Sequence, residues 1–141
     1  MVKAFFRLTL ALMILMSSTA AHVDETVTYT VQNATRTAIL HEPAATVGHA
    51  APLVIALHGS GDSVAHFQTS IGFDAVADRE NFIVAYPEAS DAHWNYGRPV
   101  RKMPLLNGQQ VDDIGFVRTL IDDLVTRKLV DANRVYVTGF S

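Results

Sequence analysis

Residues 53–62 read LVIALHGSGD, an unbroken apolar run that ends in a loop containing two glycines. An apolar run without alternation is typical of a strand covered on both faces, as in the parallel sheets of α/β proteins. Gly59 and Gly61 allow the backbone after this strand to turn tightly and to approach other groups closely. The stretch therefore predicts a central strand with a loop at its carboxyl end.

Outward from this strand, the chain alternates between strand and helix patterns. Five further segments have apolar residues at the spacing of a strand or a helix: strands at 26–32, 36–41, 82–86 and 135–137, and a helix at 73–80. An amphipathic helix, capped by Asp112 or Asp113, runs through Lys128, with a turn at 131–133 after it. A long irregular stretch covers 88–110. This order predicts an α/β fold whose sheet is mixed at one edge and parallel at its centre.

Composition narrows the class of protein. The 141 residues are 49% apolar and 18% charged, with a formal net charge of -3, which disfavours both disorder and nucleic-acid binding. Cysteine is absent, which removes zinc-thiolate sites and thiol nucleophiles. His41-Glu42 begins like H-E-x-x-H, but Ala45 occupies the place of the second histidine. We therefore expect neither a metal nor a cofactor.

The amino terminus resembles an export signal. Lys3 and Arg7 precede an apolar run at 8–16, and small residues follow at 17–21. A secretory signal peptide typically has a positively charged start, a short apolar core and small residues before its cleavage site, whereas a membrane span needs about twenty apolar residues. We expect a signal peptide at 1–21, a mature domain at 22–141 without membrane attachment, and a secreted or periplasmic location.

Two glycine-bearing loops could carry the chemistry. Gly139-Phe140-Ser141 matches the first three positions of the Gly-x-Ser-x-Gly nucleophile elbow and ends a predicted buried strand, as the elbow requires. Ser141 is therefore the candidate nucleophile. The loop His58-Gly59-Ser60-Gly61 is the candidate oxyanion loop, with the Ser60 amide as donor to the developing negative oxygen. His58 itself is interpreted as a structural histidine rather than the catalytic base.

A dinucleotide site is the rival interpretation of the same loop. Gly59-x-Gly61 after a strand resembles part of a G-x-G-x-x-G fingerprint, and Glu88 ends the next strand like a ribose-binding acid. Val64 stands at the third glycine position, where its branched side chain would obstruct close packing of helix and strand. The dinucleotide interpretation, an oxidoreductase fragment, is therefore the weaker one.

Taken in order, several motifs together resemble a known family. They are LHGSG at 57–61, FIVAYPE at 82–88, Trp94-Asn95, VDDIGF at 111–116 and DANRVYVTGFS at 131–141. The series, over residues 36–141, resembles the secreted polyhydroxybutyrate depolymerase and feruloyl esterase-type branch of the α/β-hydrolases.

The resemblance implies an α/β-hydrolase-type three-layer sandwich, with a mixed sheet that is parallel at its centre. It also implies a serine esterase acting on polyhydroxyalkanoate, feruloyl or acetyl esters. It implies Ser141 as nucleophile, His58–Gly61 as oxyanion loop, and Trp94 beside the acyl pocket; a ring that packs the long loop is the other interpretation of Trp94. Many relatives carry cysteines where this chain has Ser60 and His93, so no disulfide can clamp the pocket here.

In this fold the triad acid and histidine follow the serine along the chain. We therefore expect this sequence to be the amino-terminal portion of one catalytic domain, incomplete after the elbow strand, with little activity of its own. A noncatalytic binding domain that keeps the hydrolase scaffold is the alternative from a different class. The expected partner is an ester substrate.

Overall fold

The computed structural model describes residues 24–95, 105–106 and 109–141, so the expected signal peptide at 1–21 lies outside the described residues. The main sheet has five strands in the order β1-β2-β4-β3-β7. Their bounds are Glu25–Val31 (β1), Ala34–His41 (β2), Ala51–Leu57 (β3), Ile83–Pro87 (β4) and Val130–Gly139 (β7). A separate short ladder pairs β5, Leu105–Leu106, with β6, Gln109–Gln110.

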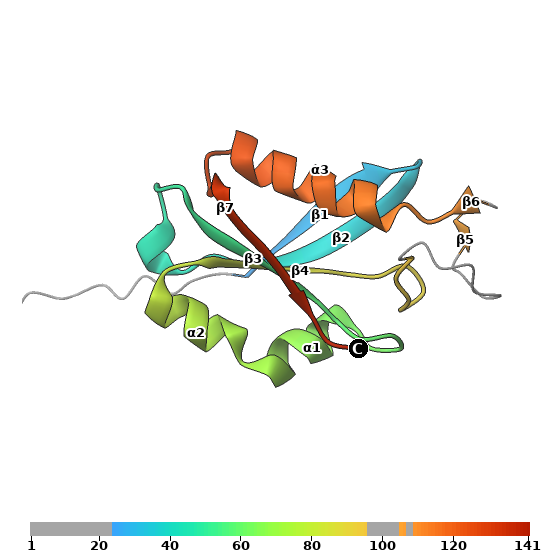
Figure 1. Cartoon of the computed structure of the whole chain (residues 1–141), viewed down its shortest axis with the longest axis horizontal. Coiled ribbons are helices and arrows are strands. Elements are labelled where there is room, and N and C mark those ends of the chain that lie inside the picture. The colour runs from blue at the N-terminus through green and yellow to red at the C-terminus, as the bar shows by residue number, and fades with distance from the viewer. Residues whose placement is uncertain (1–23, 96–104, 107–108) are drawn as a thin grey trace, which may run out of the picture.

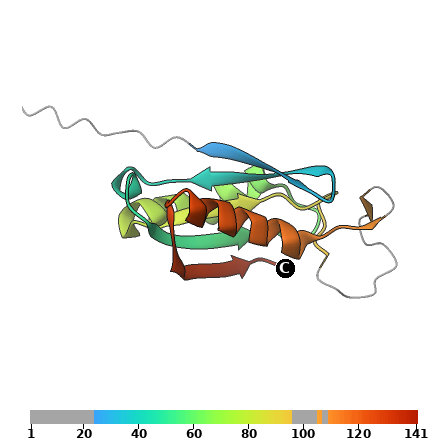
Figure 2. The same ribbon diagram turned by 90° about the horizontal axis from the view of Figure 1, so that it is seen from above.

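Helices cover both faces of the main sheet. They are α1 (Val64–Ile71), α2 (Phe73–Glu80), α3 (Asp113–Thr126) and the short 3₁₀ helix η1 (Ala44–Thr46). The helix α3 lies on one face, and α1 and α2 lie on the other (Figure 1). β3 runs parallel to β4 and β7, whereas β2 is antiparallel to β1 and β4. The predicted three-layer α/β architecture with a parallel centre is confirmed, and Figure 2 shows α3 lying along the sheet.

The two central strands are buried on both sides. Ile55 of β3 and Phe116 of α3 belong to the core cluster on one face. Ala56, the next residue of β3, packs with Phe67 of α1 in the cluster on the other face. Because successive strand residues point to opposite faces, a strand covered by helices on both sides needs apolar residues at every position.

The helix α1 was not predicted from the sequence. Its Ser63 cap accepts a hydrogen bond from the His66 amide at 3.4 Å, and Gly72 ends it in the left-handed region at φ +68°. Gly72 also begins α2, so a single residue separates the two helices. Because α1 has only eight residues and buries few apolar side chains, its hydrophobic periodicity is weak, and the sequence pattern did not predict it.

The strand β7 begins earlier than the predicted 135–137. The predicted turn at 131–133 lies inside β7, where its register against β3 shifts. Within it, the Asn133 amide donates to Asp131 Oδ1 at 2.9 Å, as in an Asx turn. The turn is therefore an irregularity in the ladder rather than a break before it. The helix α3 also ends at Thr126, before the predicted Lys128, whose φ is +61°.

A buried histidine surrounded by carboxylates closes the end of β2. His41 Nδ1 lies 3.0 Å from Asp24 Oδ1 and 3.8 Å from Asp74 Oδ2, and His41 Nε2 lies 3.1 Å from Asp78 Oδ1. Burial by itself lowers the pKa of the ring, but the hydrogen bonds to Asp24 and Asp78 and the charge of Asp74 outweigh it. The pKa of His41 is therefore raised above its ordinary value.

This arrangement makes the stability depend on pH. Because the folded pKa of His41 lies above the unfolded value of about 6.5, the folded state binds more protons across that interval. We expect the free energy of unfolding to fall as the pH rises from about 6.5 through the raised pKa, and His41→Gln to flatten that fall. Urea unfolding at a series of pH values measures both slopes. The exposed His49→Gln serves as control, and a His41→Gln slope equal to that of the unmodified protein contradicts the prediction.

Candidate active site

The two candidate loops lie side by side at the carboxyl ends of parallel strands. Leu57 of β3 is the ladder partner of Gly139 of β7, and the Phe140 amide donates to the Leu57 carbonyl at 3.1 Å. A Cβ on Gly59 would lie 3.5 Å from Ser141 Cβ and 3.2 Å from the Phe140 carbonyl oxygen. The fold thus brings the predicted oxyanion loop into contact with the predicted nucleophile, although Gly59 and Ser141 are 82 positions apart (141 − 59) in the sequence.

The backbone around Ser141 has the features of a tight elbow. Ser141 has φ +54°, in the left-handed region that residues other than glycine seldom adopt. At Gly139, an added Cβ would lie 3.1 Å from both the Cβ and the carbonyl oxygen of Leu57. These contacts are tighter than most Cβ contacts, so any larger residue would require Leu57 to shift by a few tenths of an ångström. The Ser141 side chain is exposed, at the carboxyl end of β7.

A cavity of about 250 Å³ lies over this serine. It is lined by Leu57, His58, Trp94, Gly139, Phe140 and Ser141. The cavity is mostly apolar, with the candidate hydroxyl in its wall, as suits a small acyl group.

His58 is buried and fastens the loop to the residues that follow β4. Its Nδ1 lies 2.9 Å from the Gly59 carbonyl oxygen. Its Nε2 lies 3.1 Å from the Ala89 amide nitrogen and 3.0 Å from Glu88 Oε1. Both ring nitrogens are occupied by partners other than Ser141. This geometry supports the structural interpretation of His58.

Trp94 both packs the loop and forms a wall of the cavity. Its Nε1 donates to the His58 carbonyl at 2.8 Å, and its ring centroid lies 5.3 Å from that of His58. The same ring lines the cavity over Ser141. The two interpretations of Trp94 are therefore compatible.

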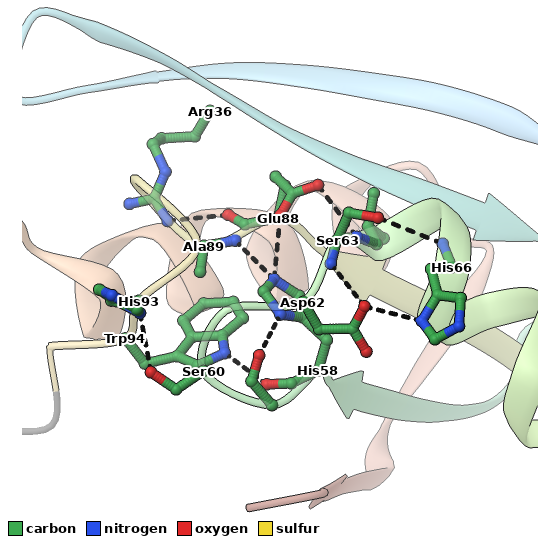
Figure 3. A network of polar contacts seen from close by, with 12 residues as sticks. Arg36, His58, Ser60, Asp62, Ser63, His66, Glu88, Ala89, His93 and Trp94 are labelled. Carbon is green, nitrogen blue, oxygen red and sulfur yellow. Dashed lines mark hydrogen bonds and ion pairs between the residues drawn. The ribbon is translucent and has the colours of Figure 1, made fainter.

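Further hydrogen bonds join the candidate oxyanion loop to the turn at 90–94 (Figure 3). Ser60 Oγ lies 2.7 Å from His93 Nδ1, and the Gly61 amide donates to the Ala92 carbonyl at 2.8 Å. Ser60 and His93 are the positions where the resemblance implied a lost disulfide. A hydrogen bond links them instead, which the sequence analysis did not anticipate.

A buried ion pair anchors the other side of the same turn. Arg36 Nη2 donates to Asp113 Oδ1 at 2.6 Å and to the Glu88 carbonyl at 3.0 Å, and Asp113 Oδ2 accepts from the Asn95 amide at 2.5 Å. The side chains of Arg36 and Asp113 are only 5% and 6% exposed, and the guanidinium lies 4.3 Å above the Phe116 ring. No motif in the sequence points to a role for Arg36; an arginine inside a strand that otherwise alternates is the available signal.

The two acids at the start of α3 have different tasks. Asp112 is the cap, since its carboxylate accepts from the Gly115 amide at 2.7 Å, whereas Asp113 pairs with Arg36. Glu88 Oε2 accepts from the Val64 amide at 3.0 Å, at the first turn of α1. That contact, with the one to His58, occupies the carboxylate that the dinucleotide interpretation assigned to a ribose.

Among the described residues, Asp24, His41 and Asp74 offer ligand atoms within 4.8 Å of one another. They lie at the end of the sheet opposite Ser141, because β2 ends beside the start of β4. The Gln68 amide donates to both carboxylates at 2.9 Å, and each ring nitrogen of His41 has a carboxylate partner. Hydrogen bonds and ion pairs thus join the side chains of this cluster to one another.

Solved structures share this arrangement of strands and helices. The S-formylglutathione hydrolase of Agrobacterium tumefaciens aligns with a TM-score of 0.67 and 13% identity, over 85% of this chain and 49% of that one. This likeness shows that the chain has the α/β-hydrolase fold, with the two candidate loops after β3 and β7. Residues 36–141 match the family described as Esterase PHB depolymerase, and the chain belongs to that family.

Curated relatives agree with this assignment. The poly(3-hydroxyalkanoate) depolymerase C of Paucimonas lemoignei is 30% identical over 96 residues, which are 64% of this chain and 22% of that protein. The feruloyl esterase B of Neurospora crassa is 29% identical over 91 residues, 63% of this chain and 30% of that protein. The chain thus spans less than a third of either relative's length. In the part of the chain that the structure describes, no helix is long and apolar enough to cross a membrane.

Proposed function

We propose that this protein is an exported serine esterase in which Ser141 forms an acyl-enzyme. The observation that carries the proposal is the contact between two loops: the Gly59 backbone packs against Ser141 at the carboxyl ends of β3 and β7. Membership of the esterase family and the cavity over Ser141 support the same proposal.

The reaction would proceed in two balanced steps. In the first, Ser141 Oγ bonds to the ester carbonyl carbon while its proton passes through a base to the leaving alkoxide, which departs as the alcohol. In the second, water adds to the acyl carbon, the bond to Oγ breaks, and the carboxylic acid leaves with the serine restored. Each step develops a negative oxygen, and one well-placed amide donor lowers such a barrier by about 3 kcal/mol.

The hydrogen bonds of the loop indicate which amide can serve. The Gly61 amide donates to Ala92 and the Asp62 amide donates to Gly59, whereas the Gly59 and Ser60 amides have no acceptor among the described residues. Of these two, we expect the Ser60 amide to be the oxyanion donor. The second expected donor, the amide of the residue after Ser141, lies outside this sequence.

A serine hydroxyl needs a neighbouring base that a third group holds in place. In residues 24–95 and 109–141, no histidine is hydrogen-bonded to Ser141; His58 and His93 have other partners. The base and its acid are therefore expected from residues after Ser141, in the order usual for this fold.

The substrate class is a carboxylic ester, of the polyhydroxyalkanoate, feruloyl or acetyl type. The names of the two curated relatives support the first two of these. The apolar cavity, with Trp94 in its wall, is suited to one acyl unit rather than to a long chain. Export follows from the signal-peptide pattern at 1–21.

A fluorophosphonate tests the proposal directly, because its phosphorus is attacked by activated serines and fluoride leaves. The probe is applied to the protein made from the complete reading frame, since the chain spans only part of its relatives' length. We expect stoichiometric labelling that peptide mass spectrometry maps to Ser141 and that Ser141→Ala abolishes. The exposed Ser70→Ala variant should label like the unmodified protein. Absence of labelling would instead favour the noncatalytic binding domain.

A further inference from the structure

We propose that His93 is a positioning residue for the oxyanion donor: by holding the Ser60 hydroxyl, it keeps the Ser60 amide directed toward the oxygen that becomes negative. This inference rests on the proposed function of Ser141. The contact that carries it is the 2.7 Å hydrogen bond between Ser60 Oγ and His93 Nδ1.

Ser60 needs an external anchor because of its neighbours in the chain. It lies between Gly59 and Gly61, and Gly61 has φ +84°. Glycines on both sides leave the peptide planes around Ser60 with more conformational freedom than any other pair of residues would. Ser60 is also exposed, so packing does not hold its side chain. The hydroxyl and the amide belong to the same residue, and fixing the first restrains the second.

His93 is well placed to supply that anchor. Its own amide donates to the Ser90 carbonyl at 3.1 Å, which closes a tight turn. The next residue, Trp94, is held by the bond from its Nε1 to the His58 carbonyl. The imidazole therefore extends from a segment that is fixed on both sides (Figure 3). A positioning group acts only when its own support is rigid.

Of the hydrogen bonds that hold this loop, the Ser60–His93 bond is the one made by the side chain of the proposed donor residue. The bond from the Gly61 amide to the Ala92 carbonyl is made by backbone groups and holds the residue after the donor. The Trp94 bond holds His58, two residues before it. Without the imidazole, the loop stays attached at both ends and Ser60 gains freedom between them. The expected effect is thus on the direction of one amide rather than on the fold.

The test compares His93→Ala, His93→Asn, Ser60→Ala and the double alanine variant in the complete protein, with p-nitrophenyl acetate as substrate. We expect kcat to fall about 10-fold in His93→Ala while KM changes less than about 2-fold, because the bond acts on the transition state. Asparagine has a polar atom close to the position of Nδ1, so His93→Asn should recover most of kcat. Ser60→Ala keeps the amide and should resemble His93→Ala, and the double variant should be no worse than either.

Two controls separate this inference from a loss of stability and from the proposed function. The exposed His49→Ala should keep full kcat, and all variants should melt within a few degrees of the unmodified protein. An increase in KM at constant kcat, additive effects of the two alanines, or covalent labelling of Ser60 by the fluorophosphonate would overturn the role of His93. If Ser141→Ala abolishes labelling while His93→Ala leaves kcat unchanged, only the present inference fails. If Ser141 is not labelled at all, the proposed function fails first.

Discussion

Replacing Ser141 by alanine is expected to lower the kcat of the complete protein on p-nitrophenyl acetate by on the order of 10⁶-fold, with KM almost unchanged. The reason is that alanine removes the atom that forms the covalent bond to the acyl group, so base and acid have no hydroxyl to activate. What remains is catalysis by binding and by the oxyanion donor, about 10³-fold over the reaction in water. Steady-state kinetics at saturating substrate measures the difference.

The matched control for this variant is Ser70→Ala, which removes an exposed hydroxyl from α1 and should leave kcat unchanged. A burst of p-nitrophenol equal to the enzyme concentration should precede the steady state in the unmodified protein and be missing in Ser141→Ala. If Ser141→Ala retained more than about a tenth of the normal turnover, another residue would have to be the nucleophile.

Replacing Asp113 by asparagine is expected to reduce the free energy of unfolding by about 3–5 kcal/mol. The change leaves the guanidinium of Arg36, which is 5% exposed, without its counter-charge. The Glu88 carbonyl and the Phe116 ring remain as its partners, and neither carries a full negative charge. Since a typical domain is stabilised by about 5–15 kcal/mol, the loss is a large fraction of the total. Urea unfolding followed by circular dichroism measures it.

Arg79→Met provides the comparison for an exposed pair. Arg79 and Glu80 form an ion pair in which both side chains are more than half exposed, and its removal should cost no more than about 1 kcal/mol. Replacing both Arg36 and Asp113 by apolar residues of similar size should recover much of the loss, because no buried charge then lacks a partner. An Asp113→Asn variant as stable as Arg79→Met would show that the buried pair contributes little.

The strands of this protein could be predicted because their signals are local. The apolar run of β3 and the alternation in β1 each repeat within a few residues, so neither depends on what lies across the sheet. The turns at 139–141 and 58–61 could also be predicted from the sequence, because backbone turns of this kind need glycine or tolerate few other residues. Their contact follows from the fold class, because the carboxyl ends of neighbouring parallel strands meet at the same edge of the sheet.

The partners of the polar side chains could not be read in the same way. His93 lies 33 residues from Ser60, and Asp113 lies 77 residues from Arg36. Nothing in the short-range pattern around either residue selects its partner, because the pairing depends on which strands become neighbours in the sheet.

By itself, then, the sequence determined the order of the five main strands and of the helices α2 and α3, the covering of β3 and β4 on both faces, and the two glycine-dependent turns, since short-range periodicity and backbone sterics decide all three. Only the tertiary structure decided that the turn at 90–94 holds the loop beside Ser141, that Arg36 supports the far side of that turn, and that His41 is enclosed by carboxylates. The strand order β2-β4-β3-β7 brings these distant segments to common ends of the sheet, and polar groups buried there must find their partners among whatever the fold places beside them.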